Sequence, residues 1–451
     1  MAQSRGGAKR RPEGSSEPFA PTPMPRAEAS SVIANGSAAS GGGARSWTLW
    51  GSVLSPFALK VDALCDFSGL PHRWLPPEAG RSEGLRAWRR VRRLSTGRLP
   101  LTWPRLDPLD ELPLTPFLLG PDGENLFDSS AIGEWLDRAH PGPYPLLPRG
   151  DPALRLAVRL VDEHFDEFGL YMVHHNRWVV SARGNDAGAR LARDFRPVLG
   201  PLAQLLAHSF PARQVRRLPY LFSVAPGDAG FDDLPPRLRP PAREGFPPTH
   251  LLLEERFART LAVLEKVLAA RPYLFGERFT LADASVYGQL MMNVSDPCAE
   301  AWMRREAPRL RAWLDRIAAA DFAASRADGA LALDEAVRPL LGEVVSVLVP
   351  LLQQNRDAWQ RHAATGEAHF NERAFDAGRS LYDGALAGHP FRAVAKTFQV
   401  RVWRSLREEW DSLADADRAR LEALLPAGHG LDRSGACRPV TGSTATAPTD
   451  G

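Results

Sequence analysis

Apolar positions divide the chain into a part with strand-like spacing and a longer part with helical spacing. Residues 47–50 and 114–119 are apolar runs of strand length, and Gly120-Pro121-Asp122-Gly123 supplies turn chemistry after the second run. From residue 152 onward, apolar residues recur at helical spacing over long stretches. The pattern predicts an α/β segment followed by an all-helical segment.

Residues 115–132, TPFLLGPDGENLFDSSAI, predict a strand, a tight turn, a second short strand and the start of a helix. A proline cannot donate to a sheet ladder, so Pro116 is unusual where a buried strand begins. We interpret Thr115-Pro116 as a cis peptide that turns the backbone toward a ligand.

Asp128 and Ser129 fall where the predicted helix begins. The unpaired N–H groups and the dipole of a helix start favour a carboxylate. The Ser129 hydroxyl adds a donor and Asp128 adds a partner for an ammonium group, so the pair would hold an amino-acid-like zwitterion. The alternative is that Asp128 or Ser129 is the N-cap of an ordinary helix.

The first strand is followed by Ser55-Pro56 and a helical stripe that ends at Gly69. Pro56 fits the first helical turn, where its missing N–H costs nothing, and Ser55 is then the N-cap. Residues 72–75 begin a second strand. This order is that of the opening of a thioredoxin-like domain, in which Cys65 is a small packed hydrophobe.

Three segments resemble the glutathione transferase superfamily in its serine type: SPFALKVDALCDFSGLP, TPFLLGPDGENLFDSSAI and RPYLFGERFTLADASVYGQL. The resemblance implies an α/β thioredoxin-like N-terminal domain, an all-α C-terminal domain and an extra helical extension. It implies glutathione as co-substrate, with no metal. Ser55 would contact the glutathione sulfur, Thr115 and Pro116 its cysteinyl unit, and Asp128 and Ser129 its γ-glutamyl end.

The expected boundaries follow from this resemblance and from composition. We expect a disordered tail at 1–46, a thioredoxin-like glutathione-binding domain at 47–140 with an insert at 76–113, an all-helical domain at 150–322 with an insert at 211–248, a helical extension at 331–425 and a disordered tail at 428–451. Within the first insert, Arg98 and Arg105 are either contacts for the glycine carboxylate of glutathione or surface arginines.

The helical segment carries two polar patterns. Asp162, Glu163, His164, Asp166 and Glu167 match no metal-binding spacing, so we interpret them as a polar helix face lining the cleft. Thr280 and Asp283 form a capping pair, to which we assign a structural role.

The sequence of the extension predicts two helices that each have an apolar face, and these faces need a partner surface. The first runs from Leu340 to Leu352, and the second includes Phe391, Val394 and residues up to 413. We expect them to pack on residues 151–322, with Trp403 or Trp410 at least partly buried and with Lys396 and Arg401 facing solvent.

Charge and cysteine content limit the class of protein. The net charge of the chain is +3, and residues 1–46 account for it with six basic and three acidic residues. The remaining residues are therefore neutral overall, without the excess of positive charge that is typical of nucleic-acid binding. Cys65, Cys298 and Cys437 form no metal or redox spacing, and no run is long enough to span a bilayer. We expect a cytoplasmic protein with no membrane partner.

Two functions compete. The first is a detoxifying transferase that adds the glutathione thiolate to a small apolar electrophile, as a homodimer if the extension permits it. Phe168, Tyr171, Met172 and Trp178 would then form an apolar wall, or are simply core. The second is a non-catalytic binding or interaction protein that retains the fold. A glutathione-dependent reductase would place cysteine where Ser55 stands, and is disfavoured.

Overall fold

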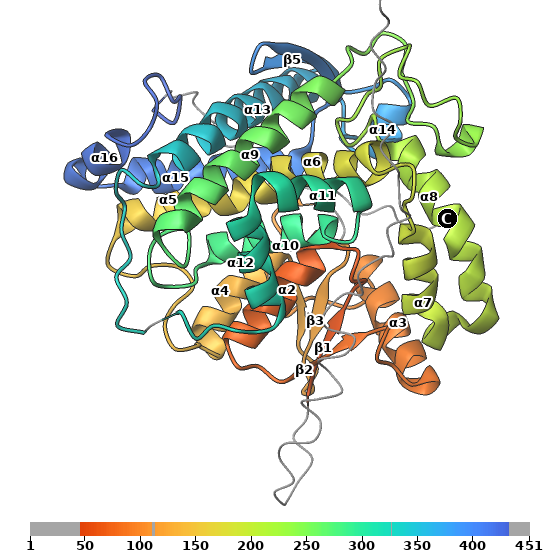
Figure 1. Ribbon diagram of the computed structural model, residues 1–451, viewed down its shortest axis with the longest axis horizontal. Coiled ribbons are helices and arrows are strands. Elements are labelled where there is room, and N and C mark those ends of the chain that lie inside the picture. Colours follow the sequence, from red (N-terminus) through yellow and green to blue (C-terminus); the bar gives the residue numbers. More distant parts are fainter. Residues whose placement is uncertain (1–45, 111–112, 326, 433–451) are drawn as a thin grey trace, which may run out of the picture. The chain divides into compact units, whose positions relative to one another are not determined.

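The computed structural model describes residues 46–110, 113–325 and 327–432. The tails predicted at 1–46 and 428–451 therefore lie almost entirely outside the described residues. Four strands form a sheet in the order β2-β1-β3-β4 (Figure 1): β1 (Trp47–Trp50), β2 (His72–Leu75), β3 (Phe117–Leu119) and β4 (Asn125–Phe127). β1 is parallel to β2 and antiparallel to β3, which is antiparallel to β4. This topology is thioredoxin-like, as predicted.

Three helices belong to this part of the chain: α2 (Pro56–Phe67), α3 (Arg81–Ser95) and α4 (Ser129–Ala139). α2 begins as predicted, with Ser55 as N-cap and Pro56 in the first turn. It is buried because α10 (Leu281–Asn293) packs closely on it. A Cβ at Gly288 would lie 2.4 Å from the Pro56 carbonyl oxygen, so only glycine permits this approach.

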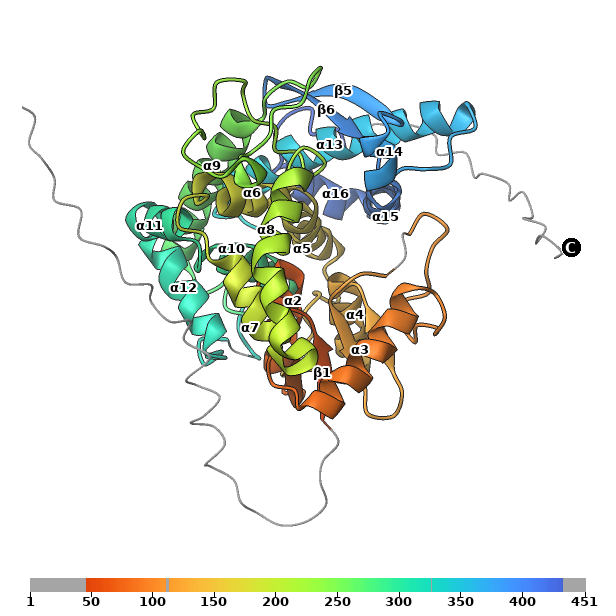
Figure 2. The same ribbon diagram turned by 90° about the vertical axis from the view of Figure 1, so that its right-hand side faces the viewer.

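The following helices form an α-helical part (Figures 1 and 2). A continuous helical stretch runs through α5 (Pro152–His164), η1 (Phe165–Gly169), α6 (Leu170–His175) and η2 (Asn176–Val180). The remaining elements are α7 (Ala187–Leu199), η3 (Gly200–Ala203), α8 (Gln204–Arg217), η4 (Pro236–Leu238), α9 (His250–Ala270), α10, α11 (Pro297–Glu306) and α12 (Pro308–Ala318). The insert predicted from residue 211 is irregular only after α8 ends.

The capping pair at the start of α10 is present as predicted. The fully buried Asp283 carboxylate accepts hydrogen bonds from the Thr280 N–H (2.9 Å) and hydroxyl (2.6 Å) and from the Leu274 N–H (2.9 Å). These hydrogen bonds lower the pKa of Asp283, but burial outweighs them and raises it to about 6. The pair thus joins the loop before α10 to the helix start.

The extension packs on α5 and α9, as predicted, but it is not wholly helical. Its elements are α13 (Arg338–Ala364), α14 (Glu372–Asp376), β5 (Leu381–Leu386), β6 (His389–Val394), α15 (Thr397–Ser412) and α16 (Asp415–Glu422). Phe391 and Val394 lie in β6, so their assignment to a helix face was wrong. Ala387 and Gly388 both have positive φ, which permits the two-residue hairpin turn between β5 and β6.

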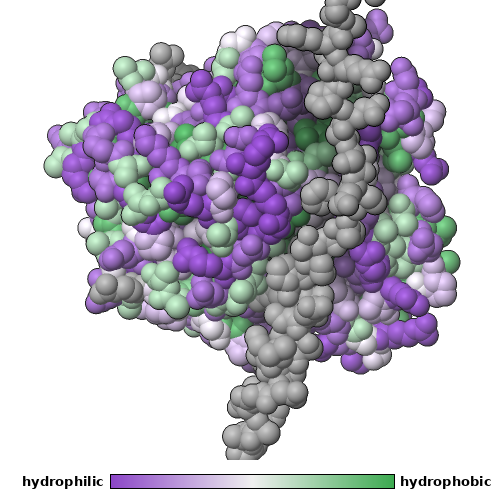
Figure 3. Space-filling model, in the orientation of Figure 1, coloured by the Kyte–Doolittle hydropathy of each residue, from purple (hydrophilic) through white to green (hydrophobic). Residues whose placement is uncertain are grey.

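The apolar faces of the extension are buried as predicted. Trp403 and Trp410 are each 2% exposed. On the face drawn in Figure 3, hydrophilic residues are interspersed with apolar ones. Among the described residues, no helix is long and apolar enough to cross a membrane.

Candidate functional site

The register of the sheet brings the predicted site residues to one end of it. Trp50 of β1 pairs with Phe117 of β3, and Phe117 pairs with Phe127 of β4. Because β1 and β4 both run opposite to β3, the residues after Trp50, before Phe117 and after Phe127 share one sheet end. These three connections contain Ser55, Thr115-Pro116 and Asp128-Ser129, respectively.

Ser55 is half-buried at the start of α2. Its Oγ accepts a hydrogen bond from the Ala58 N–H (3.3 Å). Among the described residues, no acceptor takes its O–H proton, so the hydroxyl can donate to a ligand. Ser52, in the same connection, differs because its hydroxyl donates to Asp194 (2.7 Å).

The Thr115-Pro116 peptide is cis, as predicted. Pro116 is buried and Thr115 is exposed. A Cβ at Gly51 would lie 2.8 Å from the Ala58 Cβ and 3.9 Å from the Pro116 Cβ. The end of β1, the first turn of α2 and the start of β3 are therefore in contact.

Asp128 is the N-cap of α4, which was the alternative left open by the sequence. Its Oδ1 accepts the N–H groups of Ser130 (3.1 Å) and Ala131 (3.0 Å), and its backbone has φ of 65°. Its Oδ2 lies 3.4 Å from Nη2 of Arg401 on α15. Arg401, which was expected to face solvent, is partly exposed and paired with Asp128.

Ser129 is buried beside a network of charged side chains that the sequence did not predict. Its Oγ lies 3.5 Å from Asp166 Oδ2. Lys60 Nζ donates to Ser130 Oγ, Asp162 Oδ1 and Asp166 Oδ2, each at 2.7 Å. The network joins α2 and α4 of the sheet domain to the helical stretch that begins with α5.

The local charges explain the protonation of this network. Burial lowers the pKa of Lys60, but Asp162 and Asp166 raise it above its ordinary value. Burial raises the pKa of Asp166 to about 6, although Lys60 opposes this. Lys60 is therefore the fixed cation of the group. An isolated lysine in the apolar stripe of α2 was the signal in the sequence that could have revealed it.

A second group of polar side chains joins the same helical stretch to α15. Gln399 donates to Glu167 Oε2 (3.1 Å) and to the Tyr171 hydroxyl (3.2 Å). Lys396, which was expected in solvent, is 4% exposed and donates to Tyr171 as well. Burial, aided by nearby Glu163, raises the pKa of Glu167 to about 8. The polar face that was predicted to line a cleft is therefore divided: Glu167 contacts the extension, whereas Asp162 and Asp166 contact Lys60 of α2.

The proposed apolar wall is core. Phe168, Tyr171, Met172 and Trp178 are all at most 4% exposed. Tyr171 stacks on Phe222, with ring centroids 5.2 Å apart and an interplanar angle of 7°. Of the two alternatives for these four residues, the structure therefore supports packing.

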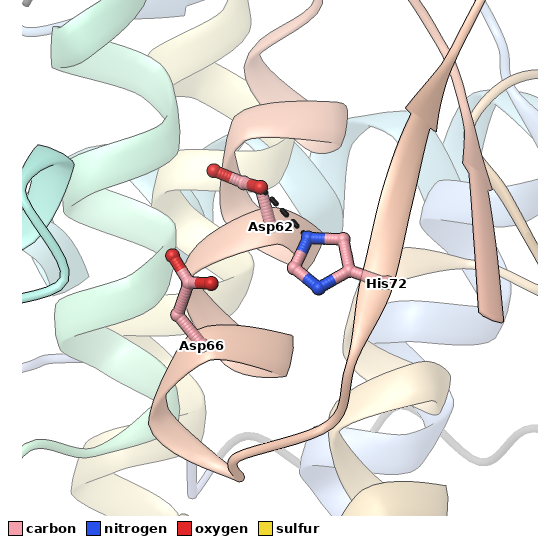
Figure 4. Close-up of side chains that lie close together, drawn as sticks. All are labelled: Asp62, Asp66 and His72. Atoms are coloured by element: carbon pink, nitrogen blue, oxygen red, sulfur yellow. Dashed lines mark hydrogen bonds and ion pairs between the residues drawn. The ribbon is translucent and has the colours of Figure 1, made fainter. Parts of the chain in front are cut away.

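One group of described side chains has the composition of a metal site. Asp62 and Asp66 lie one turn apart on α2 and point toward His72 of β2 (Figure 4). One ligand atom of each lies within 4.8 Å of the others, a donor set that Zn²⁺ accepts. His72 Nε2 is 2.9 Å from Asp62 Oδ1 and its Nδ1 is 3.0 Å from the Leu70 carbonyl oxygen. Burial lowers the pKa of His72, but Asp62 raises it above its ordinary value, so an ion pair accounts for these contacts.

Comparison with known proteins adds one family match. Residues 186–316 match the family model described as glutathione S-transferase, C-terminal domain. No curated protein matches the chain.

Solved structures of similar fold include three glutathione transferases. One from Rhodospirillum rubrum is 16% identical in sequence, and the match covers 65% of this chain and 91% of the Rhodospirillum chain, with a TM-score of 0.33. One from Methylobacterium radiotolerans, in complex with glutathione sulfonate, is 24% identical over 62% and 94%, with a TM-score of 0.31. One from Phanerochaete chrysosporium is 18% identical over 61% and 97%, with a TM-score of 0.37.

A thioredoxin-like sheet domain that continues into a helical domain matching this family model defines a protein of the glutathione-transferase type. Residues 186–316 thus carry the C-terminal domain of the glutathione S-transferase superfamily. Assignment to its serine-type subclass stays a prediction.

Proposed function

We propose that the chain binds glutathione at the sheet end where Ser55, Thr115-Pro116 and Asp128-Ser129 meet, and that it transfers the glutathione thiolate to an apolar electrophile. The observation that carries this proposal is the register that brings the three connections together. In the part of the chain that the structure describes, the Thr115 main chain makes no hydrogen bond. Its N–H and C=O can therefore pair with the cysteinyl unit like a strand added to an edge.

Ser55 would support the chemistry without acting as nucleophile. A free thiol has a pKa of about 8.5, so little thiolate is present at neutral pH. A hydroxyl that donates to the sulfur, at the start of a helix, stabilises the thiolate. The thiolate then attacks the electrophilic carbon to form the C–S bond, and the leaving group departs with the electron pair of the bond that breaks.

The second candidate, a binding protein without catalysis, is favoured by two observations. The side chains assigned to the electrophile wall are buried in the core. An open groove lies along α8 and residues 236–243, and none of the residues predicted to bind glutathione lines it. The predicted homodimer and cytoplasmic location belong to the first proposal and stay predictions.

Turnover with 1-chloro-2,4-dinitrobenzene, after retention on immobilised glutathione, separates the two candidates. The transferase should turn over, and Ser55→Ala should slow it by up to about 10²-fold while glutathione binding changes little. Ser52→Ala is the matched control, because its hydroxyl is engaged by Asp194. Retention without turnover would support the binding protein, and equal rates for wild type and Ser55→Ala would remove Ser55 from the mechanism.

A further inference from the structure

We propose that α15 of the extension completes a subsite for a zwitterion, in which Arg401 binds the α-carboxylate and Asp128 binds the α-ammonium group of the same ligand. The inference rests on the proposed function, because it assigns this subsite to the γ-glutamyl end of glutathione. Arg401 is 273 residues from Asp128 in the chain and lies outside the family match.

The contacts of Asp128 leave one oxygen for a ligand. Oδ1 is committed to the N–H groups of Ser130 and Ala131, whereas Oδ2 faces Arg401 Nη2 at 3.4 Å. This separation is longer than that of a strong charge-assisted hydrogen bond. The side chains of Arg401 and Asp128 are 34% and 29% exposed, so a ligand can reach the pair from solvent.

Arg401 has a second anchor that keeps it in place when Asp128 binds a ligand. Its Nε lies 2.7 Å from Asp110 Oδ1, an ion pair without hydrogen-bond geometry. The backbone around it is fixed, because Val402 and Trp403 are buried and Gln399 is bonded to Glu167 and Tyr171. The guanidinium group is therefore preorganised, which lowers the cost of binding.

A zwitterion matches this pair better than either charge alone. An ammonium group donates to Asp128 Oδ2 and a carboxylate accepts from the Arg401 guanidinium group, so one weak ion pair is replaced by two charge-assisted contacts. A ligand that offers only a carboxylate would pair with Arg401 and leave Asp128 without its cation, beside the acidic Asp166. The arrangement therefore selects an α-amino acid end.

The opposite role for Arg401 makes a different prediction. If Arg401 merely occupied the position of the ammonium group, it would compete with glutathione, and its removal would tighten binding. The sign of the change in affinity therefore distinguishes the two roles.

Calorimetric titration of glutathione into the full chain tests the inference. Arg401→Gln should weaken binding by about tenfold to a hundredfold, the loss expected for a hydrogen bond to a charged group. Arg401→Lys should recover part of it, and it serves as the second variant if Arg401→Gln melts lower. Arg404→Gln is the matched control, because Arg404 lies on the same helix and pairs with Asp107. We expect a change of less than about twofold for it.

The des-amino analogue N-glutaryl-cysteinylglycine provides the second arm. It should bind wild type more weakly than glutathione, and Asp128→Asn should reduce this difference. Equal or tighter glutathione binding by Arg401→Gln, with wild-type binding present, would overturn the subsite. Absence of glutathione binding by wild type would instead overturn the proposed function itself.

Discussion

Replacing Lys60 by methionine tests the charged network beneath the site. Lys60 Nζ makes three hydrogen bonds of 2.7 Å, and the side chains of Lys60, Asp162 and Asp166 are 1%, 0% and 12% exposed. Methionine fills a similar volume but leaves two carboxylates facing each other without a cation. Removing one partner of a buried pair costs about 3–5 kcal/mol, and we expect this loss in the free energy of unfolding near pH 8.

The loss should shrink as the pH falls. The folded-state pKa of Lys60 is raised, so its own contribution is complete at any pH below about 10. The folded-state pKa of Asp166 is raised to about 6 even with Lys60 present, so its carboxyl group favours the folded state less as the pH rises. At pH 5 Asp166 binds a proton, which removes one of the two uncompensated charges, and we expect the deficit to fall below about 2 kcal/mol.

Urea unfolding followed by tryptophan fluorescence at pH 5 and pH 8 measures both values. Lys266→Met is the matched control, since Lys266 is exposed on α9. Lys60→Met/Asp166→Asn should recover part of the loss at pH 8, because one uncompensated charge is gone. A deficit below about 1 kcal/mol that does not depend on pH would refute the role given to Lys60.

Three further predictions concern the site and the extension. Ser129→Ala should raise the Michaelis constant for glutathione more than it lowers the maximal rate, and steady-state kinetics would show the reverse if Ser129 acted in the chemical step. Glu167→Gln should leave the free energy of unfolding unchanged near pH 5 and raise it by about 2 kcal/mol near pH 9, because the folded-state pKa of about 8 makes the ionised carboxylate unfavourable there. Equal urea midpoints for wild type and variant at both pH values would contradict this. Truncation after Phe322 should give an insoluble or markedly destabilised protein, and a soluble product with an unchanged melting temperature would make the extension an independent module.

Local rules were sufficient for much of the sheet domain. Ser55 caps α2 because serine before proline favours a helix start, and the hairpin between β3 and β4 follows from its turn residues. The β5–β6 hairpin was missed because Phe391 and Val394 are three residues apart, a spacing that also fits a helix face.

Partners distant in the chain could not be predicted from one sequence. Lys60 meets Asp162 across 102 residues, and Arg401 meets Asp128 across 273. Both contacts depend on how the helices pack, which local pattern does not specify. Lys396 and Arg401 were expected in solvent because a charged residue on an amphipathic helix usually lies there.

A crystal structure of the protein with glutathione would test the central claim most directly. We expect electron density for glutathione at the sheet end, with its sulfur within hydrogen-bond distance of Ser55 Oγ and its cysteinyl unit paired with the Thr115 main chain. Density at another place, or none at the sheet end at a saturating glutathione concentration, would contradict it.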